Sequence, residues 1–209
     1  SMTLDQAALV EPLSIGLHAV RLTRACPGAT IAVLGTGPIG LSVLLCAKMT
    51  ADCTVYATDL IDHRLGVARD CGADWTGNPK QTDVVAAIRR EQAQGLDLVF
   101  ECSGDPACID QAIELLTPGG VVLMVGIPPT DRISFDPHVV RRHELTLMAV
   151  RRQRDCVEPV IRAIDEGLID TGPLLTHRFP LERIGEGFEL VAAYGDGVIK
   201  AMIEVSPAP

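Results

Sequence analysis

The sequence is poor in aromatic side chains and in positive charge. Of its 209 residues, 3% are aromatic and 47% are hydrophobic, so the core must be mainly aliphatic, which suits parallel sheets of Val, Ile and Leu. The formal net charge of −9 argues against nucleic acid or an anionic membrane as the main partner, because binding to such phosphate-rich surfaces needs positive charge. We therefore expect neither a nucleic-acid nor a membrane partner.

Long apolar runs and a secretion signal are also missing. The apolar stretches fall short of the roughly 18 residues that span a bilayer, and the N-terminus lacks the charged start and apolar run of a signal peptide. The seven cysteines form no C-x-x-C pair and have no histidine at ligand spacing. This pattern favours buried thiols in a reducing compartment over a metal or redox role. The sequence thus predicts a cytoplasmic protein.

The sequence does contain a regular alternation of strand-length and helix-length apolar segments. Strands are expected at 30–35, 53–59, 73–78, 96–104, 121–127 and 145–150. Helices are expected between them at 38–49, 62–72, 82–92 and 106–116, with a turn at 117–120. Because parallel neighbours need long crossovers, the alternation predicts a Rossmann-type α/β fold: a doubly wound, six-stranded parallel sheet with helices on both faces.

The character of the chain changes after Val150. A helix at 156–169, an extended segment at 174–180, a helix at 181–194 and a strand at 198–205 follow. Like residues 2–20, they show no evident sheet of their own in the sequence. We expect these terminal pieces to be the edge of a second domain.

A glycine motif lies between the first strand and the first helix. Gly35-x-Gly37-x-x-Gly40 has the spacing of a dinucleotide-binding turn, and the helix that begins near Pro38 would offer its unpaired N–H groups to phosphates. The motif alone is weak evidence, but Asp59 follows Gly40 by nineteen residues at the end of the second strand. An acid there can accept hydrogen bonds from the ribose hydroxyls and repel a 2′-phosphate, which favours NAD over NADP. Arg64 could lie along the same ribose or be an exposed helical cation.

Six stretches of the chain resemble one known family. They are ALVEPLSIGLHAV (8–20), VLGTGPIGL (33–41), ATDLIDHRLGVARDCGAD (57–74), VFECSG (99–104), TPGGVVLMVGIP (117–128) and LLTHRFPLERIGEGFE (174–189). In order and spacing they are similar to the cofactor-binding half of zinc-dependent medium-chain dehydrogenases, in the sorbitol (polyol) and threonine dehydrogenase branch. The resemblance runs over nearly the whole chain and is more specific than any single motif.

The resemblance implies a set of cofactor contacts. Gly35, Gly37, Pro38, Ile39 and Gly40 would hold the pyrophosphate, with Ile39 behind the nicotinamide ring. Asp59 and Arg64 would bind the adenosine ribose. Cys102 and Ser103 would flank the adenine, while the backbone at Val125, Ile127 and Ala149 would hold the carboxamide.

The resemblance also implies a catalytic zinc. Glu11 of EPL would lie at the metal, as a ligand or bonded to its water, and Arg151 would lie near the substrate. The family's other zinc ligands belong to an N-terminal catalytic domain that the resemblance does not match here. The expected layout is therefore a remnant of that domain with a linking helix at 2–20, an NAD-binding domain at 21–150, and a C-terminal part at 151–209 that packs on or belongs to the catalytic domain. Such a chain is expected to bind NAD weakly and to be inactive alone.

The overall expectation is an oxidoreductase that transfers hydride from a secondary alcohol or polyol to NAD. A homodimer or tetramer is expected through the sheet edge near 132–135, where family subunits join. A stand-alone NAD-binding or regulatory module and a zinc-free, NADPH-dependent reductase of the same superfamily remain as alternatives. Asp59 and Glu11 argue against the reductase. A methyltransferase would leave the later family stretches unexplained.

Overall fold

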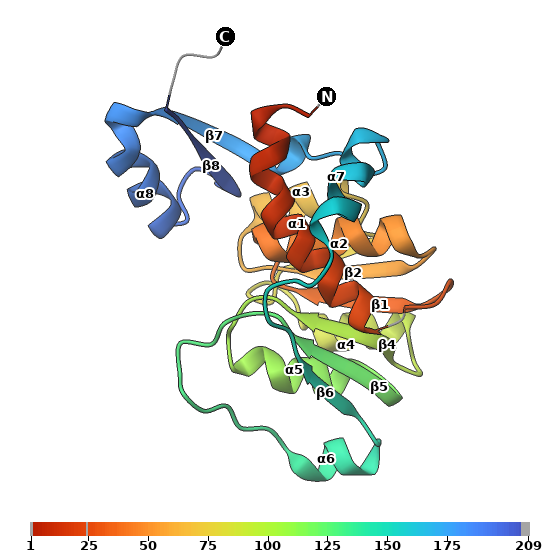
Figure 1. The fold of residues 1–209 in the computed structure, drawn as a ribbon. Helices are drawn as coiled ribbons and strands as arrows, with labels where there is room; N and C mark the ends of the chain where they lie inside the picture. Colours follow the sequence, from red (N-terminus) through yellow and green to blue (C-terminus); the bar gives the residue numbers. More distant parts are fainter. Residues whose placement is uncertain (1, 24, 206–209) are drawn as a thin grey trace.

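Six parallel strands form the main sheet of the computed structural model, which describes residues 2–23 and 25–205 (Figure 1). Their order in the sheet is β3-β2-β1-β4-β5-β6. The strands are β1 (Thr30–Leu34), β2 (Thr54–Thr58), β3 (Trp75–Gly77), β4 (Leu96–Glu101), β5 (Leu116–Met124) and β6 (Thr146–Ala149). The predicted Rossmann-type fold is confirmed.

Helices cover both faces of this sheet. They are α1 (Leu4–Thr23), α2 (Pro38–Thr50), α3 (Asp62–Asp70), α4 (Val84–Glu91), α5 (Ala107–Leu115), α6 (Pro137–Arg142) and α7 (Val157–Asp165). Helix α8 (Ile184–Ala192) belongs instead to the C-terminal part of the chain. Two aliphatic clusters form the core: one joins α1, α2, α3 and α7 to one face, and the other joins α4 and α5 to the opposite face. Alternate residues of β1 belong to alternate clusters, with Ile31 and Val33 in the first and Ala32 and Leu34 in the second.

Helix α1 approaches α2 closely at a glycine. A Cβ at Gly16 would lie 2.5 Å from the carbonyl carbon of Ser42, so a larger residue would force the two helices apart. The Sγ of Cys46 on α2 lies 3.5 Å from the Leu13 carbonyl oxygen, to which it donates. Residues 4–23 are thus part of the packing of the main sheet's helical layer, next to α7 (Figure 1).

Two local expectations differ from the structure. The turn expected at 117–120 lies inside β5 as a bulge: β4 pairs through Leu96 with Leu116 and then through Leu98 with Val121, and Gly119, between these pairs, takes a positive φ of 81°. Helix α6 was not expected. It begins with Pro137 at its first turn, and the Asp136 carboxylate accepts from the His138 N–H at 2.7 Å, which is an ordinary N-terminal cap.

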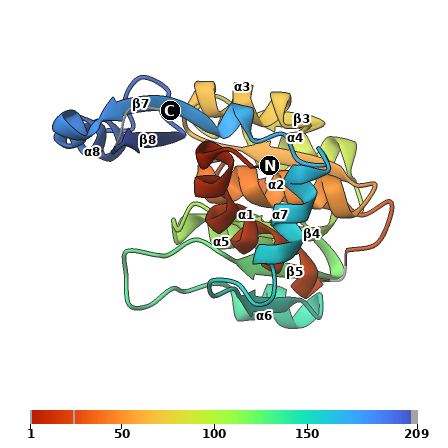
Figure 2. The ribbon, with the colours of Figure 1, turned by 45° about the horizontal axis from the view of Figure 1, so that its top comes forward.

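The C-terminal segments form a small sheet of their own, contrary to the expectation from the sequence. Strands β7 (Leu175–Pro180) and β8 (Lys200–Glu204) pair in parallel, and α8 with the short 3₁₀ turn Leu181–Arg183 makes the crossover. Nothing in the sequence of either segment shows that its partner is the other one. This β7–α8–β8 unit lies to one side of the main sheet (Figure 2).

None of the helices within the described residues has the length and apolar character needed to cross a membrane.

Candidate functional site

The candidate site lies where the sheet order reverses. From β1 the chain moves outward through β2 to β3, then returns to place β4 on the other side of β1. The loops after β1 and β4 therefore leave in opposite directions at the carboxyl ends of adjacent strands. In open parallel sheets this is the point at which ligands bind.

The three glycines of the turn after β1 have three different surroundings. Gly35 has a positive φ of 93°, and a Cβ there would lie 2.9 Å from the Ser103 backbone nitrogen. A Cβ at Gly40 would lie 1.8 Å from the Gly35 carbonyl oxygen, so the start of α2 packs directly on the turn. At Gly37 the nearest described atom to a Cβ would be Arg64 Nη1, at 3.5 Å, and the backbone is open to a ligand. These are the roles of a tight turn, a helix contact and a phosphate approach.

The N-terminus of α2 is open toward the same side. The Leu41 N–H donates to the Gly37 carbonyl at 2.9 Å as the first bond of the helix, Pro38 has no N–H, and among the described residues no side chain caps the helix. The amides of Ile39 and Gly40 are thus left without helical acceptors. Together with the helix dipole they can bind an anionic group such as a phosphate.

Asp59 is held against the glycine turn by the protein itself. Its side chain is buried, and Oδ2 accepts from the Thr36 N–H at 2.8 Å while Oδ1 accepts from the Ile61 N–H at 2.9 Å. The Thr36 hydroxyl lies 3.3 Å from the same Oδ2. Asp59 therefore fixes the turn as well as presenting a carboxylate beside it, a second task that the motif spacing does not reveal.

Arg64 lies between the turn and this carboxylate. Its side chain is 13% exposed, with Nη1 3.9 Å from Asp59 Oδ2. Its Nε is buried and has no hydrogen-bond partner within residues 2–23 and 25–205. The structure thus excludes the alternative of a solvated helical cation and brings Arg64, Asp59 and Gly37 together.

The end of β4 is organised by a residue that the sequence analysis missed. Glu101 is buried, and its Oε1 accepts from the Ser103 N–H at 2.7 Å, the Ser103 hydroxyl at 2.6 Å and the Gly104 N–H at 2.8 Å. Its carbonyl accepts from the Val125 and Gly126 N–H groups, both at 2.8 Å. Glu101 could have been identified from the sequence as a single acidic residue at the end of an otherwise largely apolar strand.

Cys102 and Ser103 lie beside the glycine turn. The Cys102 N–H donates to the Leu34 carbonyl at 2.8 Å, which joins the ends of β4 and β1. Burial, and secondarily the Glu101 carboxylate, raise the pKa of the Cys102 thiol well above its usual range. This partly buried thiol is therefore neutral at physiological pH. The expectation of buried cysteines holds for Cys46, Cys53, Cys71 and Cys156, whereas Cys26 is exposed.

Val125, Ile127 and Ala149 follow the same edge of the sheet away from the turn. Val125 is half-buried, and the backbone of Ile127 packs on Gly104, where a Cβ would lie 2.5 Å from the Ile127 carbonyl oxygen. The Ile127 side chain is 91% exposed. Ala149 ends β6 and Arg151, two residues later, is exposed.

The expected metal residue stands apart from any metal-binding cluster. Glu11 is exposed on α1, while its neighbours Val10 and Pro12 are buried. Among the described residues, no three His, Cys, Asp or Glu side chains are grouped so that they could hold a metal ion. The described residues alone do not fit a catalytic zinc.

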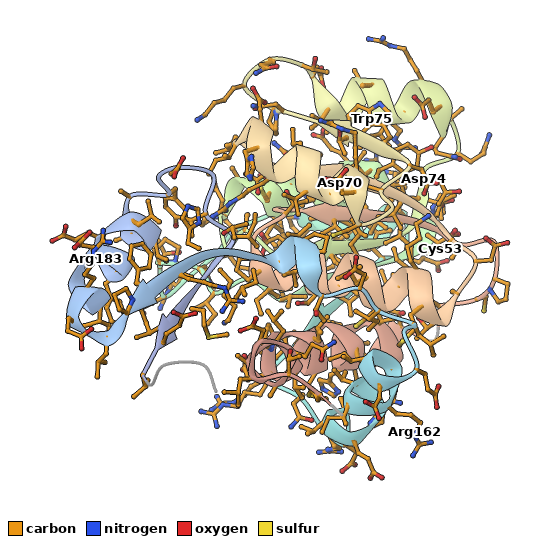
Figure 3. All side chains as sticks on the ribbon, turned by 90° about the horizontal axis from the view of Figure 1, so that it is seen from above. Cys53, Asp70, Asp74, Trp75, Arg162 and Arg183 are labelled. Atoms are coloured by element: carbon orange, nitrogen blue, oxygen red, sulfur yellow. The ribbon has the colours of Figure 1, made fainter. Side chains whose placement is uncertain are left out.

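Two surface hollows lie away from the glycine turn. One, of about 300 Å³, includes Lys48, Asp70 and Leu168, and the other, of about 270 Å³, includes Arg162 and again Leu168. In Figure 3, Asp70 of α3 lies near the middle of the view and Arg162 of α7 at the lower right, while Arg183 of the C-terminal unit is at the left. Neither hollow touches the residues of the candidate site.

Comparisons with known proteins agree with this geometry. A family model described as zinc-binding dehydrogenase matches residues 38–166. Sorbitol dehydrogenase of Gallus gallus is 34% identical over 210 residues, 99% of this chain and 58% of that protein, and the enzyme of the same name from Bacillus subtilis is 30% identical over 97% of this chain and 58% of its own length. The structure of 2R,3R-butanediol dehydrogenase from Bacillus subtilis aligns with a TM-score of 0.90 at 31% identity, over 98% of this chain and 59% of that one. The chain thus spans less than two thirds of the length of these relatives.

Proposed function

The chain belongs to the zinc-binding dehydrogenase family, and we propose that it binds NAD at the turn after β1 for the oxidation of a secondary alcohol or polyol. The names of the relatives, sorbitol and butanediol dehydrogenase, support a polyol or diol as the substrate class. The cofactor accepts a hydride from the alcohol carbon when both are bound. The chain's own contribution is to hold and orient this cofactor.

The observation that carries the proposal is the open backbone at Gly37 beside the uncapped start of α2. Gly35 and Gly40 have no room for a side chain because the fold itself fills that space, whereas the space at Gly37 is open. A pyrophosphate would approach there and accept from the Ile39 and Gly40 amides. Asp59 and Arg64 would then face the adenosine ribose.

The remaining contacts are proposed along the same edge. Cys102 and Ser103 would flank the adenine, and the backbone of Val125, Ile127 and Ala149 would hold the carboxamide. Arg151, exposed after β6, would lie near the substrate. A catalytic zinc would need ligands in addition to Glu11, and the described residues group no such set around it.

Assembly, location and layout are proposed on sequence grounds. A homodimer or tetramer would form through the sheet edge near 132–135, and the protein would be cytoplasmic. Residues 2–20 would be a remnant of a catalytic domain with the linking helix, 21–150 the NAD-binding domain, and 151–209 a part that packs on or belongs to the catalytic domain.

A bulky side chain at Gly37 tests the proposed phosphate approach. Gly37 has an ordinary φ of −70°, so Gly37→Val should fold while its side chain blocks the ligand. We expect calorimetry to show NAD binding to the wild-type chain and at least a tenfold weaker affinity in Gly37→Val, since a lost charged hydrogen bond is worth about 1.5–3 kcal/mol.

The matched control is Gly185→Val, at a glycine of α8 that also has open space around it. This variant should bind NAD as the wild type does. Unchanged NAD affinity in Gly37→Val, with a normal thermal unfolding midpoint, would overturn the proposed binding mode.

A further inference from the structure

The loop between α8 and β8 turns back from the C-terminal unit onto α3. Tyr194, Asp196 and Gly197 in this 194–197 loop all have positive φ angles, of 52°, 44° and 66°. A Cβ at Gly197 would lie 2.5 Å from Cδ2 of His63, the neighbour of Arg64. The loop therefore packs tightly on α3 at this glycine, and a side chain at 197 would require the His63 ring or the loop to shift.

The Tyr194 ring of this loop packs on Arg64. The guanidinium carbon of Arg64 lies 5.1 Å from the centroid of the Tyr194 ring, which is within cation–π distance. The Tyr194 side chain is itself 63% exposed, so burial in a core does not account for its position. The contact joins the C-terminal unit to Arg64, whose Nη1 lies beside Gly37 and 3.9 Å from Asp59 Oδ2.

Arg64 is a cation with unused hydrogen-bonding capacity. It is 13% exposed, its Nη1 is 3.9 Å from Asp59 Oδ2, and its buried Nε has no partner among the described residues. Withdrawing a guanidinium from water is costly unless its donors find acceptors. A cation–π contact uses none of the N–H donors of the guanidinium as a hydrogen bond to an oxygen, so these donors stay available to other acceptors. Such a group is suited to a ligand that brings hydroxyl or phosphate oxygens.

The 194–197 loop is also held from behind by β7. The Ile199 N–H donates to the Thr176 hydroxyl at 3.0 Å, and His177 Nε2 lies 3.4 Å from Asp196 Oδ2. The Nδ1 of His177 is 2.9 Å from the same Thr176 hydroxyl. The loop is thus held from both sides: Asp196 contacts β7, and Tyr194 and Gly197 contact α3.

We propose that Tyr194 is a positioning residue that holds Arg64 over the glycine turn for the adenosine ribose of the cofactor. This inference rests on the proposed NAD site and extends it to a part of the chain, residues 151–209, that the sequence assigned elsewhere. The loop would act on the cofactor through Arg64 and not by contact of its own. If the Tyr194 ring only attached the C-terminal unit to α3, its removal would lower the stability of the fold and leave NAD affinity unchanged.

Replacement of the ring separates these two roles. We expect Tyr194→Leu to weaken NAD binding by roughly 3- to 30-fold, the range expected for loss of a cation–π contact, and Tyr194→Phe to stay within twofold of wild type because the ring is retained. Phe188→Leu, at an aromatic residue of α8 that is 70% exposed, is the matched control and should leave NAD affinity unchanged.

The dependence on Arg64 is tested by a double-mutant cycle. In an Arg64→Leu background, Tyr194→Leu should cause no further loss of NAD affinity, because the group that it positions is gone. Gly197→Ala, whose Cβ would meet the His63 ring, displaces the same loop and should weaken NAD binding as Tyr194→Leu does. Calorimetry with NAD on the whole chain gives each affinity, and thermal unfolding checks each fold.

Three results would overturn the inference: a loss below twofold in a folded Tyr194→Leu, an equal loss in Tyr194→Phe, or the same loss with and without Arg64. If Tyr194→Leu does not fold, the other two variants decide. A loss of NAD affinity below twofold in Gly197→Ala, or a loss above twofold in Tyr194→Phe, would then overturn the inference. Failure of the wild-type chain to bind NAD would instead overturn the proposed function, and this inference with it.

Discussion

Asp59 has both a structural and a proposed binding role, and single residues of this kind decide which nucleotide fits. Its two oxygens accept from the amides of Thr36 and Ile61, so the carboxylate stands at a fixed place beside the turn. A fixed negative charge at the ribose would repel a 2′-phosphate. Selectivity for NAD over NADP would therefore follow from the charge, whereas the position of the turn follows from the hydrogen bonds.

The isosteric variant Asp59→Asn removes the charge and keeps the shape. We expect NAD affinity to fall about tenfold or more, since hydrogen bonds to a charged group are worth about 1.5–3 kcal/mol, while the preference for NAD over NADP shrinks because the repulsion is lost. Calorimetry with both nucleotides measures the two effects. Asp70→Asn, at an exposed acid of α3, should leave both affinities unchanged. A variant that lost NAD affinity but kept the full preference would contradict this role for the Asp59 charge.

The roles of single residues were predictable where the separation of residues along the chain reflects the elements between them. The glycine motif and Asp59 were found from their separation along the chain, because that separation reflects a strand, a turn and a helix. Tyr194 was missed because its partner Arg64 is brought to it only by the tertiary fold. Glu101 was missed although Ser103 and Gly104, which donate to it, are its near neighbours in the sequence.

Elements were predicted most accurately where they alternate regularly. Strands β1 to β4 and helices α2 to α5 lie within a few residues of the expected ranges. The Pro-Gly-Gly sequence at 118–120 does interrupt pairing, but as a bulge inside β5 and not as a turn between elements, because β4 pairs with Leu116 before it and with Val121 after it. Pairing between distant strands, as in the β7–β8 sheet, is also absent from any local pattern.

The outer edge of the main sheet is the element at which we expect self-association. Strand β6 has β5 on one side only, and the segment before α6 carries Phe135, which is 36% exposed. Exposed strand edges are ready to pair with another chain. A second copy of the chain is the proposed partner of this edge.

A charge at this edge tests the assembly. Sedimentation should show a dimer or tetramer for the wild-type chain and a monomer for Phe135→Asp, because a buried unpaired carboxylate is costly at an interface. Phe188→Asp, an equal change at an exposed residue of α8, should leave the assembly unchanged. A monomeric wild type, or a Phe135→Asp variant that still assembles, would refute association through this edge.

At the scale of the whole molecule, the proposed cofactor site would draw on the main sheet and on the C-terminal unit. The main sheet supplies the glycine turn and Asp59, and the 194–197 loop reaches α3 from the β7–α8–β8 unit (Figure 2). The sequence divides these parts at Val150, whereas the contacts of Tyr194 and Gly197 cross that division. Cofactor binding and the position of the C-terminal unit should therefore be linked.

The central claim is that NAD binds at the turn after β1. Its most direct test is an NMR titration of the ¹⁵N-labelled chain with NAD, because each backbone amide reports on its own surroundings. The account predicts shifts at the amides of Thr36, Gly37, Ile39 and Gly40 that saturate with NAD. Shifts confined to the hollow that includes Lys48, Asp70 and Leu168, or no shifts at all, would contradict it.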